Sequence, residues 1–308
     1  MSSDSQPILV TGGHRTGTTW VGRLLAAAPG VAYISEPLNV HHRPGVFGAK
    51  VVHWYTYICQ DNEVDFCSDF KELLSFRYRL LAELAAVRSG RDLLRMGRDV
   101  NIFAKGRLFG QRPLLKDPFA VFSLPWFAER LKSAVVVTIR HPAAFASSLK
   151  RLDWSFDFRD LLEQPLLMHD HLEPYRAAME AGIADDIIGQ ASLLWAMIYK
   201  CLDTARRGWP SIRIVRHEDL SLDPVPGFKS LYEDLGLEFS PAAERAVVLS
   251  SSPANPAELS PDKVHSVRLD SRSNLENWKR RLTADEIARV RRITGEVARL
   301  YYPEEDWN

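Results

Sequence analysis

The stretch TGGHRTGTTW, residues 11–20, follows a short apolar run and precedes a segment with helical patterning. Gly12 and Gly17 have the spacing of a phosphate-binding P-loop, in which the second glycine is followed by Lys and then Ser or Thr. Thr18 stands in the place of that lysine. A glycine-rich turn between a strand and a helix points backbone N–H groups at one place, where the helix dipole adds positive potential. The sequence therefore predicts an anion site without the usual lysine.

The missing lysine narrows the kind of anion. In an ATPase or kinase that lysine reaches the β and γ phosphates, while Ser or Thr holds Mg²⁺. Here Arg15 is the only cation of the loop, Thr18 and Thr19 add hydroxyl donors, and the chain has no apolar run ending in Asp of the Walker B kind. This pattern favours a single phosphate with a neighbouring sulfonate over a metal-bound triphosphate. The alternative is a tight turn with capping threonines and no ligand.

Strand and helix patterns alternate along the 308 residues. Short apolar runs predict buried parallel strands, and they lie at residues 8–10, 31–35, 134–139 and 212–215. Apolar residues at helical spacing predict helices, and they lie at residues 17–28, 69–89, 143–152, 185–207 and 284–302. This alternation predicts an α/β fold of the P-loop NTPase-like, three-layer kind, with a central parallel sheet flanked by helices. We expect one domain, residues 1–308, with a polar surface segment between residues 250 and 277.

Composition excludes several classes of partner. The 39 basic and 39 acidic residues balance, so no overall charge attracts nucleic acid or an anionic membrane. We find neither a signal peptide pattern nor an apolar run long enough for a membrane span. Cys59, Cys67 and Cys201 lack metal-ligand spacing and are typical of a reducing compartment. Together with the richness in Arg and Ala, these features predict a cytoplasmic protein of bacterial type.

The loop resembles that of a known enzyme family. His14-Arg15-Thr16-Gly17-Thr18-Thr19-Trp20 is similar to the Pro-Lys/Arg-Ser-Gly-Thr-Thr loop of the sulfotransferases that use 3′-phosphoadenosine 5′-phosphosulfate, PAPS. The resemblance implies that this loop grips the 5′-phosphosulfate of PAPS through Arg15, Thr16, Gly17, Thr18 and Thr19. It also implies that Trp20 stacks on adenine. His14 departs from the family's Pro, and we interpret it as a turn residue.

A second motif supports the same family. In VVVTIRHPAAFASSLKR, residues 135–151, Arg140 ends a predicted strand, Pro142 can open a helix, and Ser148 lies eight residues beyond Arg140. Family members keep an Arg and a Ser at this spacing to hold the 3′-phosphate of PAPS. A guanidinium offers a planar fork of donors to phosphate oxygens, and a serine hydroxyl adds one more. Taken separately, the two residues would be a strand-end salt bridge and a solvated helix position.

A third segment matches less completely. DSRSNLENWKRRLT, residues 270–283, resembles the late Arg-Lys-Gly-x-x-Gly-x-Trp-Lys segment that closes over the 3′-phosphate in cytosolic sulfotransferases. Trp278 and Lys279 match, whereas the glycines do not. The resemblance implies a 3′-phosphate contact from Arg272, with Ser271 and Arg268 as the other candidates.

The catalytic base does not match the cytosolic branch of the family, which has a His two residues after a Lys. Here Lys116-Asp117-Pro118-Phe119 occupies that place. The branch that sulfates protein tyrosines has Lys-Asp-Pro-Phe there and a base Glu after its second strand, which Glu36 resembles. We therefore expect Glu36 to be the general base and Lys116, with Arg15, to stabilise the transferring sulfonate. A surface carboxylate, or a salt bridge to Arg15, is the alternative for Glu36, and an ion pair with Asp117 is the alternative for Lys116.

Residues 41–112 match no motif, and we interpret them as a helical and loop insertion on the acceptor side. They include His41 and His42, an aromatic run at residues 53–57, and a basic stretch from residue 91 to residue 112. The aromatic residues could line an acceptor pocket or fill a core. The histidine pair without other ligands, and the basic stretch, are more often structural or exposed.

The sequence thus predicts an enzyme that moves a sulfonate group from PAPS to an acceptor hydroxyl by in-line transfer, releasing adenosine 3′,5′-bisphosphate, without a metal ion. A small molecule, glycolipid or natural product is the expected acceptor. Two alternatives stay open: a small-molecule kinase that uses ATP and Mg²⁺, and a non-catalytic nucleotide-binding module. The acceptor's identity and the oligomeric state are not predicted.

Overall fold

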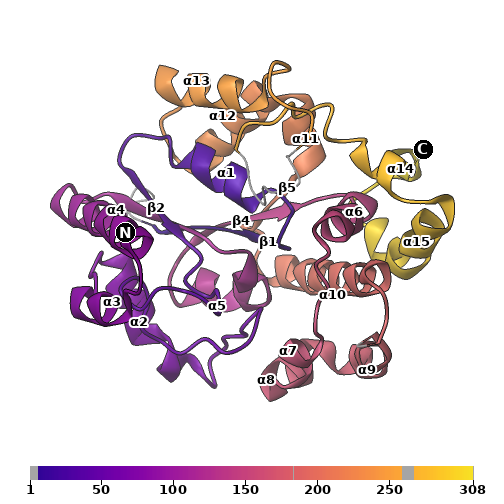
Figure 1. Cartoon of the computed structure of the whole chain (residues 1–308), viewed down its shortest axis with the longest axis horizontal. Helices are drawn as coiled ribbons and strands as arrows, with labels where there is room; N and C mark the ends of the chain where they lie inside the picture. The colour runs from indigo at the N-terminus through magenta and orange to yellow at the C-terminus, as the bar shows by residue number, and fades with distance from the viewer. Residues whose placement is uncertain (1–5, 183, 259–266, 308) are drawn as a thin grey trace.

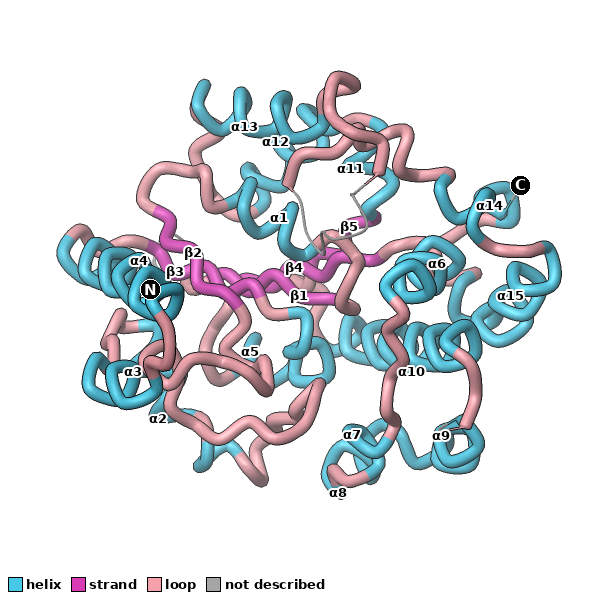
Figure 2. The backbone as a smooth tube through the Cα atoms, viewed as in Figure 1, coloured by secondary structure: helices cyan, strands magenta, loops and turns pink. Residues whose placement is uncertain are grey.

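The computed structural model describes residues 6–182, 184–258 and 267–307. Its centre is a sheet of five parallel strands in the order β2-β3-β1-β4-β5. The strands are β1 (Ile8–Gly12), β2 (Val31–Ser35), β3 (Arg112–Lys116), β4 (Ala134–Ile139) and β5 (Arg213–Arg216). Figure 2 shows them crossing the middle of the molecule between two layers of helices. The predicted α/β fold with a central parallel sheet is confirmed.

Helices cover both faces of the sheet (Figure 1). On one face lie α1 (Thr18–Leu25), α11 (His217–Leu222), α12 (Pro224–Asp234) and α13 (Pro241–Ser251). On the other lie α2 (Cys67–Leu74), α3 (Leu80–Ala86), α5 (Leu124–Glu129) and α10 (Ile187–Gly208). The remaining α-helices are α4 (Gly90–Leu108), α6 (Pro142–Leu152), α7 (Arg159–Leu162), α8 (Pro165–Leu167), α9 (Arg176–Gly182), α14 (Asn277–Arg281) and α15 (Ala284–Ala298).

The strands alternate their side chains between two apolar cores, as parallel strands buried on both faces must. In β1, Ile8 and Val10 pack in the core beneath α1 and α12, whereas Leu9 packs in the core around α10. In β4, Val136 belongs to the first core, and Val135 and Val137 belong to the second. Both cores therefore fix the sheet, and the loops that leave its carboxyl edge start from rigid positions.

Three element predictions need correction. The expected single helix at residues 69–89 is two helices, α2 and α3, because the chain turns at Phe76, whose φ is 53°. The central strand β3 was not predicted, since Pro113 interrupts an apolar run that is already short. Helix α4 was also missed because its sequence is rich in arginine; Ser89 caps it by accepting a hydrogen bond from the backbone N–H of Asp92.

The C-terminal helix α15 begins as predicted. Thr283 and Glu286 form a reciprocal capping box, and Val290 and Val297 are buried on its inner face. The helix ends at Ala298, earlier than expected, and Leu300 is exposed. Between α13 and α14, the described residues 252–258 and 267–276 contain neither helix nor strand, as predicted for this segment; residues 259–266 of it lie outside the described residues.

Candidate active site

A cavity of about 540 Å³ opens at the carboxyl edge of the sheet. Residues that follow every one of the five strands line it: Arg15 after β1, Glu36 after β2, Phe119 after β3, Arg140 after β4 and His217 after β5. Its volume lies in the range typical of small-molecule sites, and the carboxyl edge of a parallel sheet is where ligands bind in such folds.

Two glycines allow the loop between β1 and α1 to take its shape. Gly12 has a φ of 139° and Gly17 a φ of 98°, values that favour glycine. A Cβ atom on Gly12 would lie 2.3 Å from the carbonyl oxygen of Thr138, and one on Gly17 would lie 2.7 Å from Nδ1 of His217. Gly17 is also the N-cap of α1, and no side chain caps this end. The free N–H groups of the first turn are therefore left for a ligand, as in other anion sites.

Thr16 has a different place from that predicted. Its hydroxyl donates to the carbonyl oxygen of Gly13 at 2.5 Å and lies 2.8 Å from the hydroxyl of Thr138. The side chain is fully buried behind the loop and does not line the cavity, whereas Thr18 and Thr19 do. Thr16 thus holds the loop against β4, and its hydroxyl is not directed at a ligand.

The predicted pair Arg140 and Ser148 is brought together with Arg15. The Nε atom of Arg15 donates to Ser148 Oγ at 3.2 Å, and Nη1 of Arg140 donates to the carbonyl oxygen of Arg15 at 3.3 Å. Arg151, one turn beyond Ser148 on α6, and Arg281 of α14 also line the cavity. Burial, and then the charges of Arg140 and Arg151, lower the pKa of Arg15 to about 9. Crowded guanidinium groups of this kind favour a bound anion.

Two nitrogen atoms in this cluster are enclosed and unpartnered. Nε of Arg140 and Nη2 of Arg151 are buried without a hydrogen-bond partner among the described residues. The Arg140 side chain is only 9% exposed, and burial lowers its pKa. A buried donor without a partner costs free energy, so these atoms point to oxygen atoms that a ligand supplies.

The turn after β4 fixes Arg140. Glu218, at the start of α11, accepts hydrogen bonds from the backbone N–H of His141 at 2.9 Å and from the hydroxyl of Tyr302 at 2.9 Å. Trp195 of α10 donates its indole N–H to the Arg140 carbonyl oxygen at 2.9 Å. The ring of Trp278 stacks on His141 at 5.1 Å. Trp278 therefore packs the C-terminal segment beside the arginine cluster.

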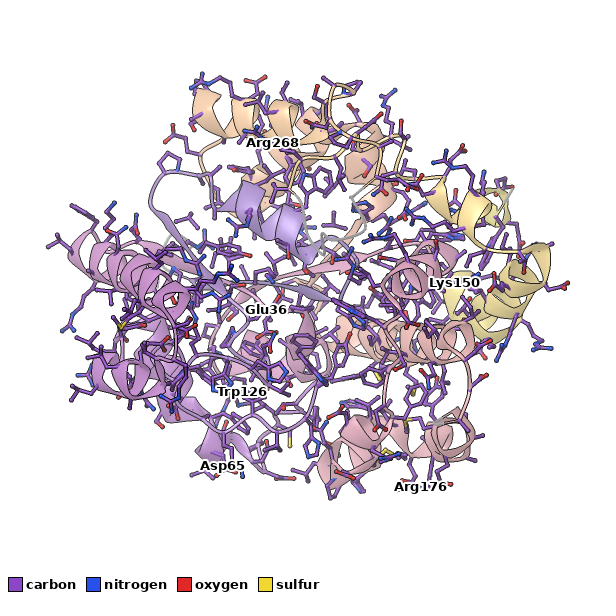
Figure 3. The ribbon with its side chains drawn as sticks, viewed as in Figure 1. Glu36, Asp65, Trp126, Lys150, Arg176 and Arg268 are labelled. Carbon is purple, nitrogen blue, oxygen red and sulfur yellow. The ribbon has the colours of Figure 1, made fainter. Side chains whose placement is uncertain are left out.

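Glu36 directly follows the last residue of β2 and lies near the middle of the molecule in Figure 3. One carboxylate oxygen pairs with Nζ of Lys116, and the other accepts a hydrogen bond from the Asn39 side-chain amide at 2.8 Å. The φ of Glu36 is 51°, a strained value of the kind found at functional sites. Asp117 supports the turn by accepting from the backbone N–H groups of Leu38 at 2.6 Å and Phe119 at 2.9 Å.

Lys116 itself is not part of the cavity lining. Its side chain is 3% exposed and passes beside Gly22 of α1, so that it contacts the cavity only through the carboxylate of Glu36. The sequence offered ion pairs of Lys116 with Asp117 and of Glu36 with Arg15 as alternatives, and the structure pairs Lys116 with Glu36.

Trp20 and His217 form a second part of the cavity. The indole N–H of Trp20 donates to Ser250 Oγ at 3.0 Å, and its ring meets the His217 ring edge to face at 5.5 Å. Nδ1 of His217 is enclosed and has no partner among the residues that the structure describes. Burial lowers the pKa of His217 to about 3, so the ring is neutral. This part of the cavity can hold a flat, neutral ring.

The late segment contributes through alternate residues. Val267, Leu269 and Ser271 line the cavity, whereas Arg268 and Arg272 are exposed and do not. Ser271 donates to the carbonyl oxygen of Ser221 at 2.8 Å, and Nη2 of Arg272 donates to that of Leu222 at 2.6 Å. Figure 3 labels Arg268 in the upper part of the molecule, near α12 and α13. Of the three candidates, the structure thus brings only Ser271 to the cavity.

Aromatic side chains line another part of the cavity. They are Trp54, Tyr55, Phe119, Trp154 and Phe156. Trp54 and Tyr55 come from the segment 41–112, for which a pocket and a core were both considered, and Trp54 packs on Phe119 at 4.5 Å. His41 and His42 do not line the cavity; the His41 ring contacts Trp54, and His42 bonds the carbonyl oxygen of Asn39. The basic stretch forms α4, which is mostly exposed.

Sequence reasoning missed several lining residues. Arg151 stands at the end of the quoted second motif, and its spacing of one helical turn from Ser148 was a usable signal. His217 begins α11 directly after β5, and no sequence pattern assigned it a role. Trp154 and Phe156 lie in a loop after α6 where no pattern marks them, so only the fold brings them to the site.

Among the described residues, no three His, Cys, Asp or Glu side chains are grouped so that they could hold a metal ion. None of the described helices is both long and apolar enough to cross a membrane.

Comparisons with known proteins give distant structural similarities and a match to a family model. Solved structures with similar folds include the sulfotransferase domain from the curacin biosynthetic pathway, with 13% identity, a TM-score of 0.48 and coverage of 95% of this chain and 97% of that one. Sulfotransferase STF9 from Mycobacterium avium has 15% identity and a TM-score of 0.48, over 98% of this chain and 78% of that one. Mouse sulfotransferase SULT7A1 complexed with PAP has 10% identity and a TM-score of 0.45, over 96% of this chain and 85% of that one.

These structural similarities are too distant to carry an argument about residues, and no curated protein sequence matches the chain. A family model, in contrast, matches residues 7–241, which include the loop after β1, Glu36, Arg140, Arg151 and α11. The chain belongs to the sulfotransferase family.

Proposed function

We propose that the protein transfers a sulfonate group from PAPS to the hydroxyl of an acceptor. The observation that carries this proposal is the set of enclosed, unpartnered nitrogen atoms of Arg140 and Arg151 in the same cavity as Glu36. The nitrogen atoms of Arg140 and Arg151 fit a donor that is rich in phosphate oxygens. The carboxylate of Glu36 fits a base beside the acceptor.

The donor's parts match three parts of the cavity. The loop around Gly17, with Arg15 and the first turn of α1, suits the 5′-phosphosulfate. Arg140, together with Ser148 and Arg151, suits the 3′-phosphate, because several guanidinium groups can bind one phosphate group. The surface that Trp20 and His217 present to the cavity suits adenine, and Ser271 lines the cavity as well.

The proposed chemistry is a direct in-line displacement. The acceptor oxygen attacks the sulfur atom, and the bond from sulfur to the 5′-phosphate oxygen breaks, so that the leaving group is adenosine 3′,5′-bisphosphate. Glu36 takes the proton of the acceptor hydroxyl. Arg15 stabilises charge on the phosphosulfate oxygen atoms. Lys116 acts behind Glu36, where its charge and the Asn39 amide hold the carboxylate in place.

The aromatic part of the cavity is the proposed acceptor site. Trp54, Phe119 and Phe156 offer an apolar surface beside Glu36, which suits a small-molecule, natural-product or glycolipid acceptor with an apolar body. Residues 41–112 then belong to the same domain as the donor site and supply acceptor contacts through Trp54 and Tyr55.

The test is transfer of radiolabelled sulfonate from PAPS to a panel of phenols, sterols, glycolipids and polyketide alcohols. We expect at least one labelled product, and adenosine 3′,5′-bisphosphate in equal amount. Glu36→Gln should lower kcat about 100-fold or more, because a positioned base contributes about 10²–10⁴-fold. Glu129→Gln, the same change at an exposed site on α5, should leave kcat unchanged. Full activity of Glu36→Gln would exclude Glu36 as the base.

A further inference from the structure

His14 lines the cavity beside Arg15 but has no part in the proposed mechanism so far. It follows Gly12, the last residue of β1, and Gly13, in the loop that suits the phosphosulfate. Its ring lies among Tyr55 at 5.9 Å, Phe145 at 5.5 Å and Trp154 at 6.5 Å. It therefore sits where the donor part and the aromatic acceptor part of the cavity meet.

The hydroxyl group of Tyr55 determines which ring nitrogen of His14 carries a proton. The backbone N–H of His14 donates to this hydroxyl oxygen at 3.1 Å, and the hydroxyl lies 2.6 Å from Nδ1 of the same residue. Tyr55 is fully buried. Because a buried hydroxyl hydrogen needs an acceptor, the arrangement that satisfies every group has Tyr55 donating to Nδ1. Nε2 is then the protonated nitrogen.

Nε2 is also the nitrogen available to a ligand. Among the described residues it accepts and donates no hydrogen bond, and it is not one of the enclosed unpartnered atoms. Burial, and then the charge of Arg15, lower the pKa of His14 to about 3, against the opposing charge of Glu36. The ring is consequently neutral, with Nδ1 engaged as an acceptor, and it can donate a hydrogen bond but cannot act as the base.

Strain supports a functional reason for this arrangement. Arg15 and Tyr55 have φ values of 68° and 60°, and both flank the ring of His14. Such values in residues other than glycine cost free energy and are retained where the surroundings require them. Contacts of the Tyr55 ring with Phe119, Phe122 and Phe156 hold it in this conformation.

We propose that His14 is a catalytic residue whose Nε2–H donates a hydrogen bond to an oxygen atom of the transferring sulfonate group, with Tyr55 as the positioning residue that fixes its tautomer. This inference rests on the proposed function. No proton is transferred by His14: the acceptor's proton goes to Glu36, and the Nε2–H bond stays intact while sulfur moves from the phosphate oxygen to the acceptor oxygen.

Binding measurements separate this role from a structural one, because PAPS and adenosine 3′,5′-bisphosphate differ by the sulfonate group. His14→Phe keeps a ring and removes the donor, and it should weaken PAPS binding about tenfold while leaving bisphosphate binding within about twofold. His14→Gln, whose amide can place an N–H near the position of Nε2, should restore most of the PAPS affinity. His171→Phe is the same substitution at a histidine that does not line this cavity, and it should change neither affinity.

The tautomer can be read without activity. Long-range ¹H–¹⁵N spectra should show His14 protonated at Nε2 in the wild-type protein, with the Nδ1-protonated form gaining population in Tyr55→Phe. If the wild type binds neither nucleotide, the proposed function fails. Suppose that the wild type binds both nucleotides. If His14→Phe then weakens the binding of both equally, or of neither, or if Nδ1 of His14 carries the proton in the wild type, the role of His14 is refuted while the proposed function stands.

Discussion

The ion pair of Lys116 and Glu36 allows a quantitative test of the base's surroundings. In Lys116→Met the side chain keeps a similar length and loses its charge. The Lys116 side chain is 3% exposed and that of Glu36 is 25% exposed. Exposed pairs contribute about 0.2–1 kcal/mol, and removing one partner of a fully buried pair costs about 3–5 kcal/mol. Because this pair lies between the two limits, we expect the free energy of unfolding to fall by about 2 kcal/mol.

The coupling between the two residues is the decisive number. Urea unfolding of the wild type, Lys116→Met, Glu36→Gln and the double variant forms a double-mutant cycle. Since the amide oxygen of a glutamine at position 36 can still accept a hydrogen bond from Lys116, Glu36→Gln alone should cost less than Lys116→Met, which leaves the Glu36 carboxylate without the Lys116 cation. We expect the double variant to be more stable than Lys116→Met, with a coupling of about 1–2 kcal/mol. A coupling below about 0.5 kcal/mol would refute the argument that this pair is buried and rigid.

Three further predictions concern the loop, a buried carboxyl and the 3′-phosphate. Gly17→Ala should destabilise the protein by at least about 2 kcal/mol more than Gly30→Ala in urea unfolding. Both glycines have positive φ, but only a Cβ atom on Gly17 would meet a neighbouring atom. Equal losses of unfolding free energy in the two variants would contradict the clash. Burial raises the pKa of Asp117 to about 7, so the native state binds more protons than the unfolded chain between about pH 4 and 7. The wild type should therefore lose stability relative to Asp117→Asn as pH rises through this range. Urea unfolding at about pH 5 and 7.5 measures this difference, and a gain in the relative stability of the wild type would exclude the argument. Arg151→Ala should weaken binding of adenosine 3′,5′-bisphosphate about tenfold but should not weaken binding of adenosine 5′-monophosphate. Lys150→Ala, at the neighbouring residue, should change neither affinity. Calorimetry that finds equal losses for both nucleotides in Arg151→Ala would contradict a 3′-phosphate contact.

Local patterns were sufficient for much of the fold because they coincide with burial. The apolar runs of β1, β2 and β4 stand out from their surroundings, and the loop after β1 has a spacing that few other structures require. In β3, Pro113 and the flanking charges hide a strand that is buried by its neighbours on both sides. Such a strand owes its conformation to the sheet and not to its own residues.

The candidate site likewise contains some residues that the sequence predicts and others that it does not. Arg15, Arg140 and Ser148 lie in motifs with fixed spacing, and the fold brings them together as predicted. Arg272 matched only a degenerate segment, and in the turn at residues 271–276 Ser271 is buried against the cavity while Arg272 is exposed. Tyr55 could not be placed, because its contact with His14 joins residues 41 positions apart.

The central claim is that this cavity binds the nucleotide of a sulfonate donor. Isothermal titration calorimetry with adenosine 3′,5′-bisphosphate, and separately with ATP and Mg²⁺, on the wild type and Arg140→Ala tests it most directly. The proposed donor site predicts that the wild type binds the bisphosphate with micromolar affinity and binds ATP more weakly. Arg140→Ala should lose about 100-fold of the bisphosphate affinity, because it removes a buried guanidinium with an unpartnered nitrogen. Tight binding of ATP with Mg²⁺, together with no binding of the bisphosphate, would contradict it and identify a phosphotransferase site.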